Sequence, residues 1–154
     1  MFLELRNLKD EPDFPSQLTI QQVTEGEPLL QSLRIWENGS PEEVIEIWFR
    51  LYSGLQLTDS HPLRLYLGLL DGQPVATSSV FFAAGVTCIG FVSTLPAYRR
   101  QGLGKAMTLK ALNTARESGY RIATLTASPM GAAIYRRLGF RECGTFSTYL
   151  WHPR

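Results

Sequence analysis

Hydrophobic and polar positions along this chain change period several times, which predicts a mixture of strands and helices. Alternating or continuous apolar runs predict strands, and apolar residues spaced three or four apart predict helices. The strand pattern covers residues 18–23, 64–70, 74–82, 86–94 and 121–126, and two closing strands are expected at 140–143 and 146–151. The helical pattern covers residues 29–36, a stretch that begins at Pro41, residues 103–118 and a segment after Ser128.

The helix that begins at Pro41 carries several local signals. Ser40 suits the N-cap, proline suits the first helical position, and the two acids that follow suit the positive end of a helix. Its apolar residues recur at three–four spacing and form a stripe that consists of Val44, Ile47, Trp48, Leu51 and Leu55.

The order of these elements predicts the fold class. Asp71-Gly72 is a strong hairpin signal, so the strands around it are expected to form an antiparallel meander with the next strand. The helix at 103–118 then acts as a crossover that makes the following strand parallel. The prediction is an α/β (α+β) fold of order βααβββαβαββ, with a mixed, mostly antiparallel sheet and helices on both faces. Residues 1–17 are interpreted as an N-terminal strand and linker, and residues 18–154 as the domain.

Length and composition narrow the class of protein. A chain of 154 residues suits one domain with a real core. It has no apolar run long enough to span a bilayer and no signal-peptide pattern at its start, so we expect a soluble, cytoplasmic protein without a membrane partner. Cys88 and Cys143 lie in apolar segments and are interpreted as buried small residues rather than as a disulfide or metal site.

The overall charge of +1 hides an asymmetry between the two halves of the chain. Residues 1–91 hold five basic and twelve acidic residues, a net charge of −7, and residues 92–154 hold ten basic and two acidic residues, a net charge of +8. A basic half suits a polyanionic small molecule. Nucleic acid is not expected as a partner, because no aromatic–basic interleaving accompanies the charge.

The segment between residues 92 and 107 predicts a phosphate-binding loop. Pro96 ends the preceding strand, two glycines then stand where a helix begins, and the free N–H groups of a helix N-terminus attract phosphate. The spacing excludes a P-loop and a dinucleotide fingerprint, because Ala106 and Met107 stand at required positions. What remains is Arg-x-x-Gly-x-Gly, which is formed by Arg99, Arg100, Gln101, Gly102, Leu103 and Gly104 and is followed by Lys105.

A second motif runs from Ser128 to Phe140. Ser128 suits an N-cap, Pro129 the first helical position and Gly139 the position just past the helix end. Tyr135 lies off the apolar stripe of Met130, Ala133, Ile134 and Leu138, and the small residues Gly131 and Ala132 precede it by one turn. Their size leaves room for a slender molecule to pass the phenol.

The two motifs, in this order, resemble those of the GNAT-type N-acetyltransferases, and the resemblance extends over residues 18–151. It implies transfer of an acetyl group from acetyl-CoA to a primary amine, on a small molecule or a peptide, by direct attack in a ternary complex without a metal. It implies that Tyr135 is the general acid. It also implies a cofactor site formed by Val92, Ser93, Thr94, Arg99, Arg100, Gln101, Gly102, Leu103, Gly104, Lys105, Ser128 and Tyr135.

This sequence departs from the family pattern at two places. Residues 88–94 contain no carboxylate to act as general base, and the substitutes are Asp59, His61, three acids on the early helix (Glu42, Glu43 and Glu46) or ordered water. Ser128 stands where many members have an asparagine that contacts the cofactor. A non-catalytic CoA-binding or regulatory module is therefore the alternative function.

Two further expectations concern partners. Tyr66–Thr77 and the ending Tyr149–Trp151 resemble a group of larger acetyltransferase-like proteins, in which this domain follows another one. The expected protein partner of this domain is therefore either a second copy, in a homodimer, or a preceding domain in a longer chain. The acidic half supplies the wall that faces the acceptor in this family, so a cationic amine is expected to be attracted there.

Overall fold

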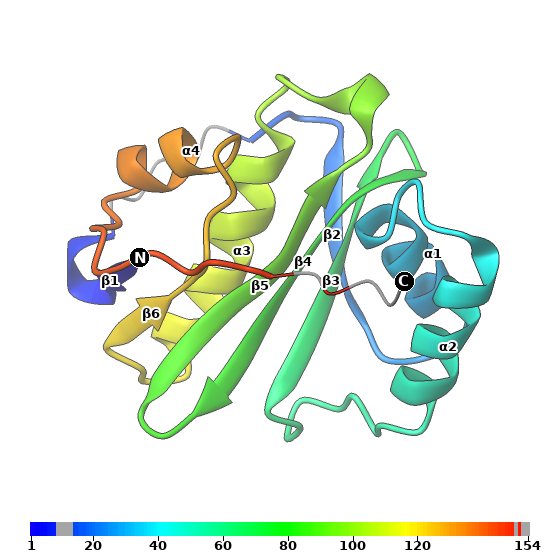
Figure 1. Ribbon diagram of the computed structural model, residues 1–154, viewed down its shortest axis with the longest axis horizontal. Helices are drawn as coiled ribbons and strands as arrows, with labels where there is room; N and C mark the ends of the chain where they lie inside the picture. The colour runs from blue at the N-terminus through cyan, green and yellow to red at the C-terminus, as the bar shows by residue number, and fades with distance from the viewer. Residues whose placement is uncertain (9–13, 150, 152–154) are drawn as a thin grey trace.

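The computed structural model describes residues 1–8, 14–149 and 151 (Figure 1). Its strands are β1 (Phe2–Glu4), β2 (Leu18–Val23), β3 (Leu63–Leu70), β4 (Gln73–Ala83), β5 (Val86–Thr94) and β6 (Ile122–Thr124). Its α-helices are α1 (Gly26–Trp36), α2 (Glu42–Ser53), α3 (Leu103–Glu117) and α4 (Ala132–Arg137). Two short 3₁₀ helices cover Leu5–Asn7 and Pro96–Tyr98.

The six strands form one sheet in the order β1-β6-β5-β4-β3-β2. Every neighbouring pair is antiparallel except β5 and β6, which are parallel because α3 crosses between them. Asp71 and Gly72 join β3 to β4 with φ of 48° and 80°, the left-handed backbone that a two-residue hairpin turn needs. The predicted mixed, mostly antiparallel sheet with helices on both faces is confirmed.

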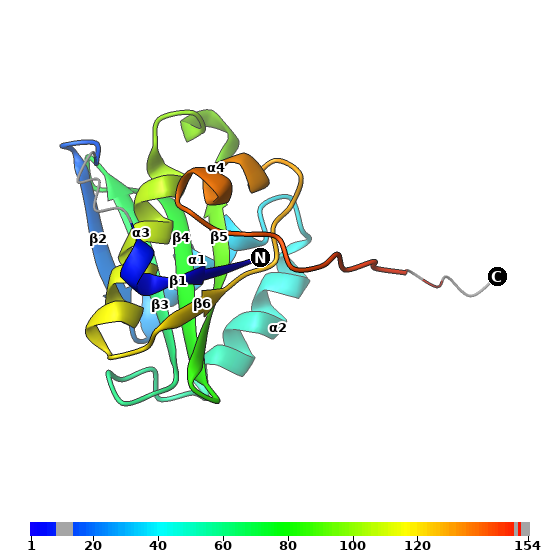
Figure 2. The same cartoon turned by 90° about the vertical axis from the view of Figure 1, so that its left-hand side faces the viewer.

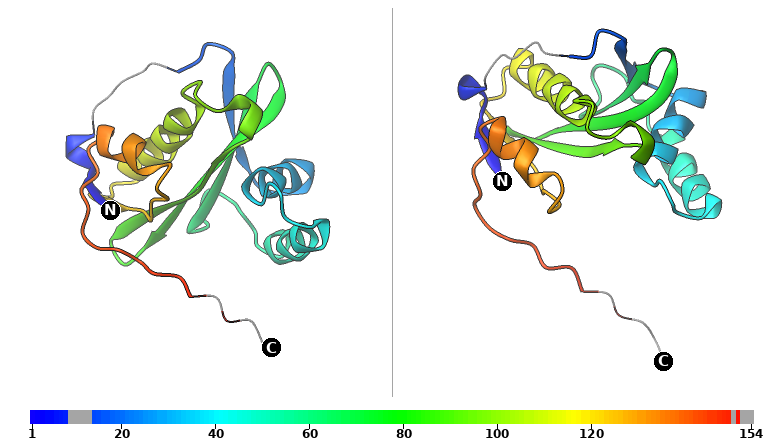
Figure 3. Two further views of the ribbon diagram at one scale, coloured as in Figure 1. Left: turned by 45° about the horizontal axis from the view of Figure 1, so that its top comes forward. Right: turned by 90° about the horizontal axis from the view of Figure 1, so that it is seen from above.

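Each face of the sheet has its own core, and the two helix pairs lie on opposite sides (Figure 3). On one side, α3 packs across β4 and β5, and α4 and the first residues of the chain complete the cluster. On the other side, α1 packs on the sheet and α2 packs mainly on α1. Gly68 on β3 permits the close approach of α3, because a Cβ there would lie 2.7 Å from the Met107 sulfur.

The two predicted closing strands are wrong. After α4, only Arg141 pairs with the sheet among the described residues, through an isolated antiparallel bridge to Phe2. Residues 142–149 and 151 form no strand, and Leu150 lies outside the described residues. The physical reason is the sheet order, since β1 occupies the position beside β6 where a closing strand would pair.

Both cysteines are exposed, which corrects the prediction that they are buried. Along β5, Thr87 and Ile89 are buried and Cys88 points to the opposite side, where this end of the strand is uncovered. Cys143 lies beyond the last bridge to the sheet. Both are free thiols, and the described residues contain no group of three metal-ligating side chains.

The apolar stripe predicted for α2 is largely exposed. Ile47, Leu51 and Leu55 are 56, 58 and 39% exposed, whereas Ile45 is the buried residue of this helix. The helix contacts α1 through a neighbouring face, so these three residues of the stripe stay uncovered in the described chain, whereas Trp48 packs against Trp36. The helix also begins one residue later than predicted, with Pro41 at the N-cap, and the Ser40 hydroxyl donates to Glu37 at 2.7 Å instead.

Candidate functional site

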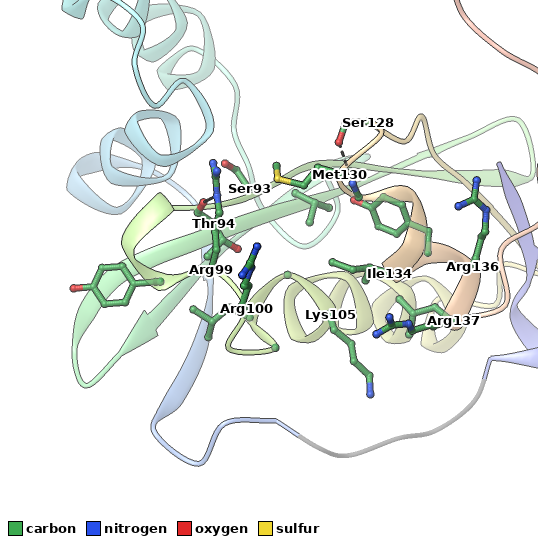
Figure 4. A pocket seen from close by; sticks show the side chains of 18 residues that line it. Ser93, Thr94, Arg99, Arg100, Lys105, Ser128, Met130, Ile134, Arg136 and Arg137 are labelled. Carbon is green, nitrogen blue, oxygen red and sulfur yellow. Dashed lines mark hydrogen bonds between the residues drawn. The ribbon is translucent and has the colours of Figure 1, made fainter.

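An open groove of about 1200 Å³ lies between the end of β5, the loop after it, the start of α3 and α4 (Figure 4). It exists because β5 extends beyond its pairing with the parallel strand β6. The pairing of β5 with β6 covers Thr87–Ala123 and Cys88–Thr124, and β5 then continues to Thr94 without this partner. The last residues of β5 therefore line the groove with backbone as well as side chains.

A bulge in β5 marks the same place. The β4–β5 register changes between Ser79, which pairs with Gly90, and Thr77, which pairs with Ser93. Two residues of β5 thus oppose one of β4, and Phe91 has a φ of 50°. Left-handed backbone at a bulky residue is strained, and strained residues are found most often at functional sites.

The predicted phosphate loop forms a concave turn at the start of α3. Arg100 and Gly102 both have left-handed backbone, with φ of 63° and 80°, and Gly102 is the N-cap residue. The first helical bond runs from the Ala106 N–H to the Gly102 carbonyl at 3.0 Å, so the N–H groups of the first turn precede the intrahelical ladder. Turns of this kind and helix N-termini bind anions.

Gly104 keeps this turn open toward the groove. A Cβ built there would lie 3.8 Å from the Thr94 hydroxyl and 3.9 Å from Ile134, so the fold leaves room for a small side chain. Around it, the groove is cationic. Arg99 is positioned by a hydrogen bond from its Nε to the Thr94 carbonyl at 3.2 Å, and Arg136 and Arg137 approach from α4 (Figure 4).

Tyr135 is buried at the α4 side of the groove and is 8% exposed. Its ring packs edge-on against Phe140, with centroids 5.9 Å apart. Burial raises the pKa of the phenol above its ordinary value of 10, and a side-chain hydrogen bond with Thr108 opposes this shift. Tyr135 therefore remains a neutral proton donor through the physiological pH range.

The glycine one turn before Tyr135 makes room for the tyrosine ring itself. A Cβ on Gly131 would lie 3.0 Å from the Tyr135 ring, so the space at Gly131 is filled by the phenol itself. The predicted apolar stripe of this helix is also partly wrong, because Met130 and Ala133 are exposed and Tyr135 is buried beside Leu138. The short helix packs through its later residues.

Ser128 caps a turn rather than the helix. Its hydroxyl and its carbonyl both accept from the Gly131 N–H, at 3.2 and 3.0 Å, and α4 begins only at Ala132. The prediction that Pro129 is the first helical residue is wrong, because a turn precedes the helix. Gly139 has a φ of 97° just past the helix end, as its predicted position requires.

None of the proposed substitutes for a general base lines the groove. Glu42 pairs with Arg34 at 2.6 Å, and Glu43 and Glu46 are exposed. Asp59 accepts from the Gln22 amide at 2.9 Å, and the His61 ring accepts from the Leu63 N–H at 3.1 Å. The described residues that line the groove include no aspartate or glutamate.

Aromatic side chains occupy the opposite face of the sheet beside the bulge. The Phe91 ring stacks on Trp36 at 4.1 Å, and Tyr52 meets Phe91 edge-on at 5.9 Å. Trp48 meets Trp36 edge-on at 5.3 Å. The Ser93 hydroxyl donates to the Ile35 carbonyl at 3.0 Å and so fixes the end of α1 to β5.

The structure brings together most of the predicted cofactor residues. The groove is lined by Val92, Ser93, Thr94, Arg99, Arg100, Gly102, Leu103, Gly104, Lys105, Ser128 and Tyr135, whereas Gln101 is exposed and not part of its lining. The groove is also lined by residues that the predicted set lacks: Tyr98, Met130, Gly131, Ile134, Arg136, Arg137 and Leu138. The adjacent Arg136-Arg137 pair follows Tyr135 directly, and this charge beside a candidate catalytic residue was the signal that could have found it.

Comparison with known proteins identifies the class. Residues 29–140 match the model of the Acetyltransferase (GNAT) family. A GCN5-related N-acetyltransferase from Kribbella flavida is 31% identical, with a TM-score of 0.70 over 91% of this chain. A predicted acetyltransferase from Clostridium acetobutylicum, solved with acetyl-CoA, is 19% identical over 86% of this chain and 96% of its own, with a TM-score of 0.68.

A third similar structure is AAC(6')-Iy in complex with a bisubstrate analogue, CoA-S-monomethyl-acetylneamine. It is 17% identical over 90% of this chain and all of its own, with a TM-score of 0.67. The family match covers most of the chain, so this protein belongs to the GNAT acetyltransferase family. The chain spans about half the length of the Kribbella flavida protein, 52%. No helix in the described part of the chain is long and apolar enough to cross a membrane.

Proposed function

We propose that this protein is an acetyl-CoA-dependent N-acetyltransferase that acts on a primary amine. The observation that carries the proposal is the groove, which combines an anion-binding turn with a buried, protonated phenol. Family membership supports an acyltransferase, and the Clostridium acetobutylicum neighbour was solved with acetyl-CoA.

The proposed cofactor site follows from the chemistry of the groove. The first turn of α3 and the Arg100 backbone would hold the diphosphate, while Arg99 and Arg137 supply positive charge around it. Arg136 also lines the groove, but its guanidinium is paired with Glu142. The backbone of Val92–Thr94 would pair with the pantetheine arm and place an N–H near the thioester oxygen. Bound acetyl-CoA supplies a thioester that an amine can attack.

Tyr135 is the proposed general acid. The amine nitrogen forms the new C–N bond, the C–S bond breaks, and the leaving sulfur takes the Tyr135 proton. The proton that the amine loses goes to water, and solvent restores the phenol. Water is the proposed acceptor because the described lining of the groove contains no carboxylate.

A non-catalytic CoA-binding module is the second candidate, and the missing carboxylate favours it. The two functions differ at the phenol, because binding alone needs no proton donor next to sulfur. Thiol release from acetyl-CoA should therefore be measured across polyamines, aminoglycosides, amino acids and lysine peptides. Binding of CoA without thiol release for any amine would favour the module.

Gly104→Glu tests the cofactor site. The carboxylate would stand where the phosphates are expected, and the space around Gly104 lets the fold persist, so CoA affinity should fall by at least about a hundredfold. Gly54→Glu adds the same charge at the end of α2, where a Cβ makes ordinary contacts, and should leave the affinity unchanged. Calorimetry with CoA measures both variants; equal affinities would contradict the site.

A further inference from the structure

The aromatic side chains beside the bulge lie across β5 from the cofactor groove. The end of α1 supplies Trp36, α2 supplies Trp48 and Tyr52, and β5 supplies Phe91. We call these four residues the aromatic cluster. All four are partly exposed, and Phe91 is the residue with left-handed backbone. The cluster therefore leaves ring surface in contact with solvent next to the strained residue of the bulge.

The edge of β5 beside the bulge is open from both faces of the sheet. Its pairing with β6 ends at Cys88–Thr124, and α3 and α2 lie on opposite sides of β5 (Figure 2). The groove with Tyr135 occupies the α3 and α4 side. The α1 and α2 side is thus a second approach to a thioester held at this edge.

The chemistry of acetyl transfer favours this second approach for the amine. The amine nitrogen must reach the thioester carbon from a direction that the leaving sulfur does not occupy. In the proposed reaction, Tyr135 gives its proton to that sulfur from the α4 side. The open approach passes the aromatic cluster, because Phe91 directly precedes Val92, which lines the groove. The cluster is therefore placed to contact the body of the acceptor.

The sheet next to the cluster presents an uncharged path along β5. Gly90 pairs with Ser79, which also pairs with Leu65 of the core under α1, so Gly90 faces the same side. A Cβ on Gly90 would lie 3.1 Å from the Ser79 hydroxyl, and the glycine keeps this place free of a side chain. Two residues earlier on the strand, Cys88 pairs with Phe81, and both are exposed.

The helix beside this path is also uncharged where it meets the cluster. Val44, Trp48 and Tyr52 follow one another at four-residue spacing, so they share one line of α2, and each is partly exposed. Burial raises the pKa of the Tyr52 phenol above its ordinary value of 10, so this ring stays neutral through the physiological pH range. An acceptor on this side meets ring faces rather than ion pairs.

We propose, on the basis of the acetyl transfer proposed above, that the aromatic cluster selects an acceptor amine with an aromatic body, an arylalkylamine. Partly exposed rings bind a further ring by stacked and edge-to-face contact. The ring faces offer no hydrogen bonds to the many hydroxyl and amino groups of an aminoglycoside, and burying those groups without partners is unfavourable. A ring face also attracts an ammonium group, so a diamine is the discriminating competitor.

Thiol release from acetyl-CoA tests the selection on the unaltered protein. The acceptors are 2-phenylethylamine, ethylamine, butane-1,4-diamine and an aminoglycoside, with each rate corrected for the neutral fraction of the amine. Because the ring of 2-phenylethylamine is buried, its kcat/KM should exceed that of ethylamine and of the diamine by at least about tenfold. A diamine or an aminoglycoside that is used better than 2-phenylethylamine would overturn the proposal.

A matched pair of double variants locates the selection. Trp48→Gln with Tyr52→Gln removes two rings of the cluster, and the ratio of kcat/KM for 2-phenylethylamine to that for ethylamine should fall at least about tenfold. Ile47→Gln with Leu51→Gln makes the same change at the same spacing on the exposed face of α2 and should leave the ratio unchanged. Equal ratios in the two variants, both with an unchanged far-ultraviolet spectrum, would contradict the role of the cluster.

Binding without turnover distinguishes this selection from the acetyl transfer itself. In a Trp151→Phe background the remaining tryptophans are Trp36 and Trp48, so 2-phenylethylamine added to the CoA-bound protein should change their emission. A change in emission without thiol release from any amine would reject the acetyl transfer and retain the aromatic site. Thiol release with no change in emission would reject the aromatic site alone, and the absence of both signals would reject both proposals.

Discussion

The two faces of the central sheet differ in charge and in the kind of side chain that they present. The face under α3 and α4 gathers arginines, a left-handed turn and a buried phenol around a groove. The face under α1 and α2 carries the aromatic cluster of Trp36, Trp48, Tyr52 and Phe91 next to the same strand. The comparison teaches that β5 serves both faces, since its bulge turns Phe91 to one side while Val92 and Thr94 line the groove on the other.

Tyr135→Phe should have the largest effect on the groove side of the sheet. The variant keeps the ring that packs against Phe140 and Gly131 and removes the proton donor, so turnover should fall by ~10²–10⁴-fold. CoA affinity should hardly change. Steady-state rates and calorimetry measure the two quantities; a loss in turnover of less than about tenfold would assign the acid to another group.

The pH dependence should show the second largest effect. An unperturbed amine has a pKa of ~10.4, so its neutral fraction grows about tenfold per pH unit below that value. Burial raises the pKa of Tyr135, so the phenol keeps its proton over the same range and does not limit the rate. We expect the rate at saturating acetyl-CoA to rise by up to ~100-fold from pH 7 to 9. A plateau below about pH 8 would indicate a base near the amine.

Ionic strength should have the smallest effect, which is on KM for the amine. The acidic wall expected from the sequence predicts that KM for a cationic amine rises with ionic strength, because exposed charges are screened beyond ~8 Å at physiological salt. The structure places aromatic rings beside β5 and turns Glu42 and Asp59 to other partners. We therefore expect KM to change by less than about twofold between low and physiological salt. A steep rise of KM with ionic strength would instead indicate that acidic side chains attract the amine, as expected from the sequence.

Much of the fold could be predicted because the signals are local. The bounds of β2 and β5 agree with the hydrophobic pattern residue by residue, and Asp71-Gly72 forms its turn because only a few residue types accept left-handed backbone. The candidate groove was predictable for the same reason. A strand end, glycines at a helix start and a tyrosine on a later helix each carry a recognisable pattern.

The predictions that failed concern tertiary packing, that is, which segment packs against each helix or strand. Periodicity predicted the apolar stripe of α2, but packing on α1 buries Ile45 and leaves Ile47 and Leu51 exposed. Residues 143–149 and 151 have the composition of a strand, but β1 already pairs with β6, so they join no strand of the sheet in the described part of the chain. Arg136 and Arg137 were missed because their approach to the groove depends on where α4 packs.

The sequence by itself therefore determined the order of the elements as far as the last helix, the hairpin turn at Asp71-Gly72 and the glycine-containing start of α3, because backbone preference and side-chain period act over a few residues. Only the tertiary structure decided that β5 extends beyond its pairing with β6 and that the phenol of Tyr135 fills the space beside Gly131. It also decided which apolar faces stay uncovered. These features arise from contacts between segments far apart in the chain, and no local pattern specifies which of several apolar faces will meet.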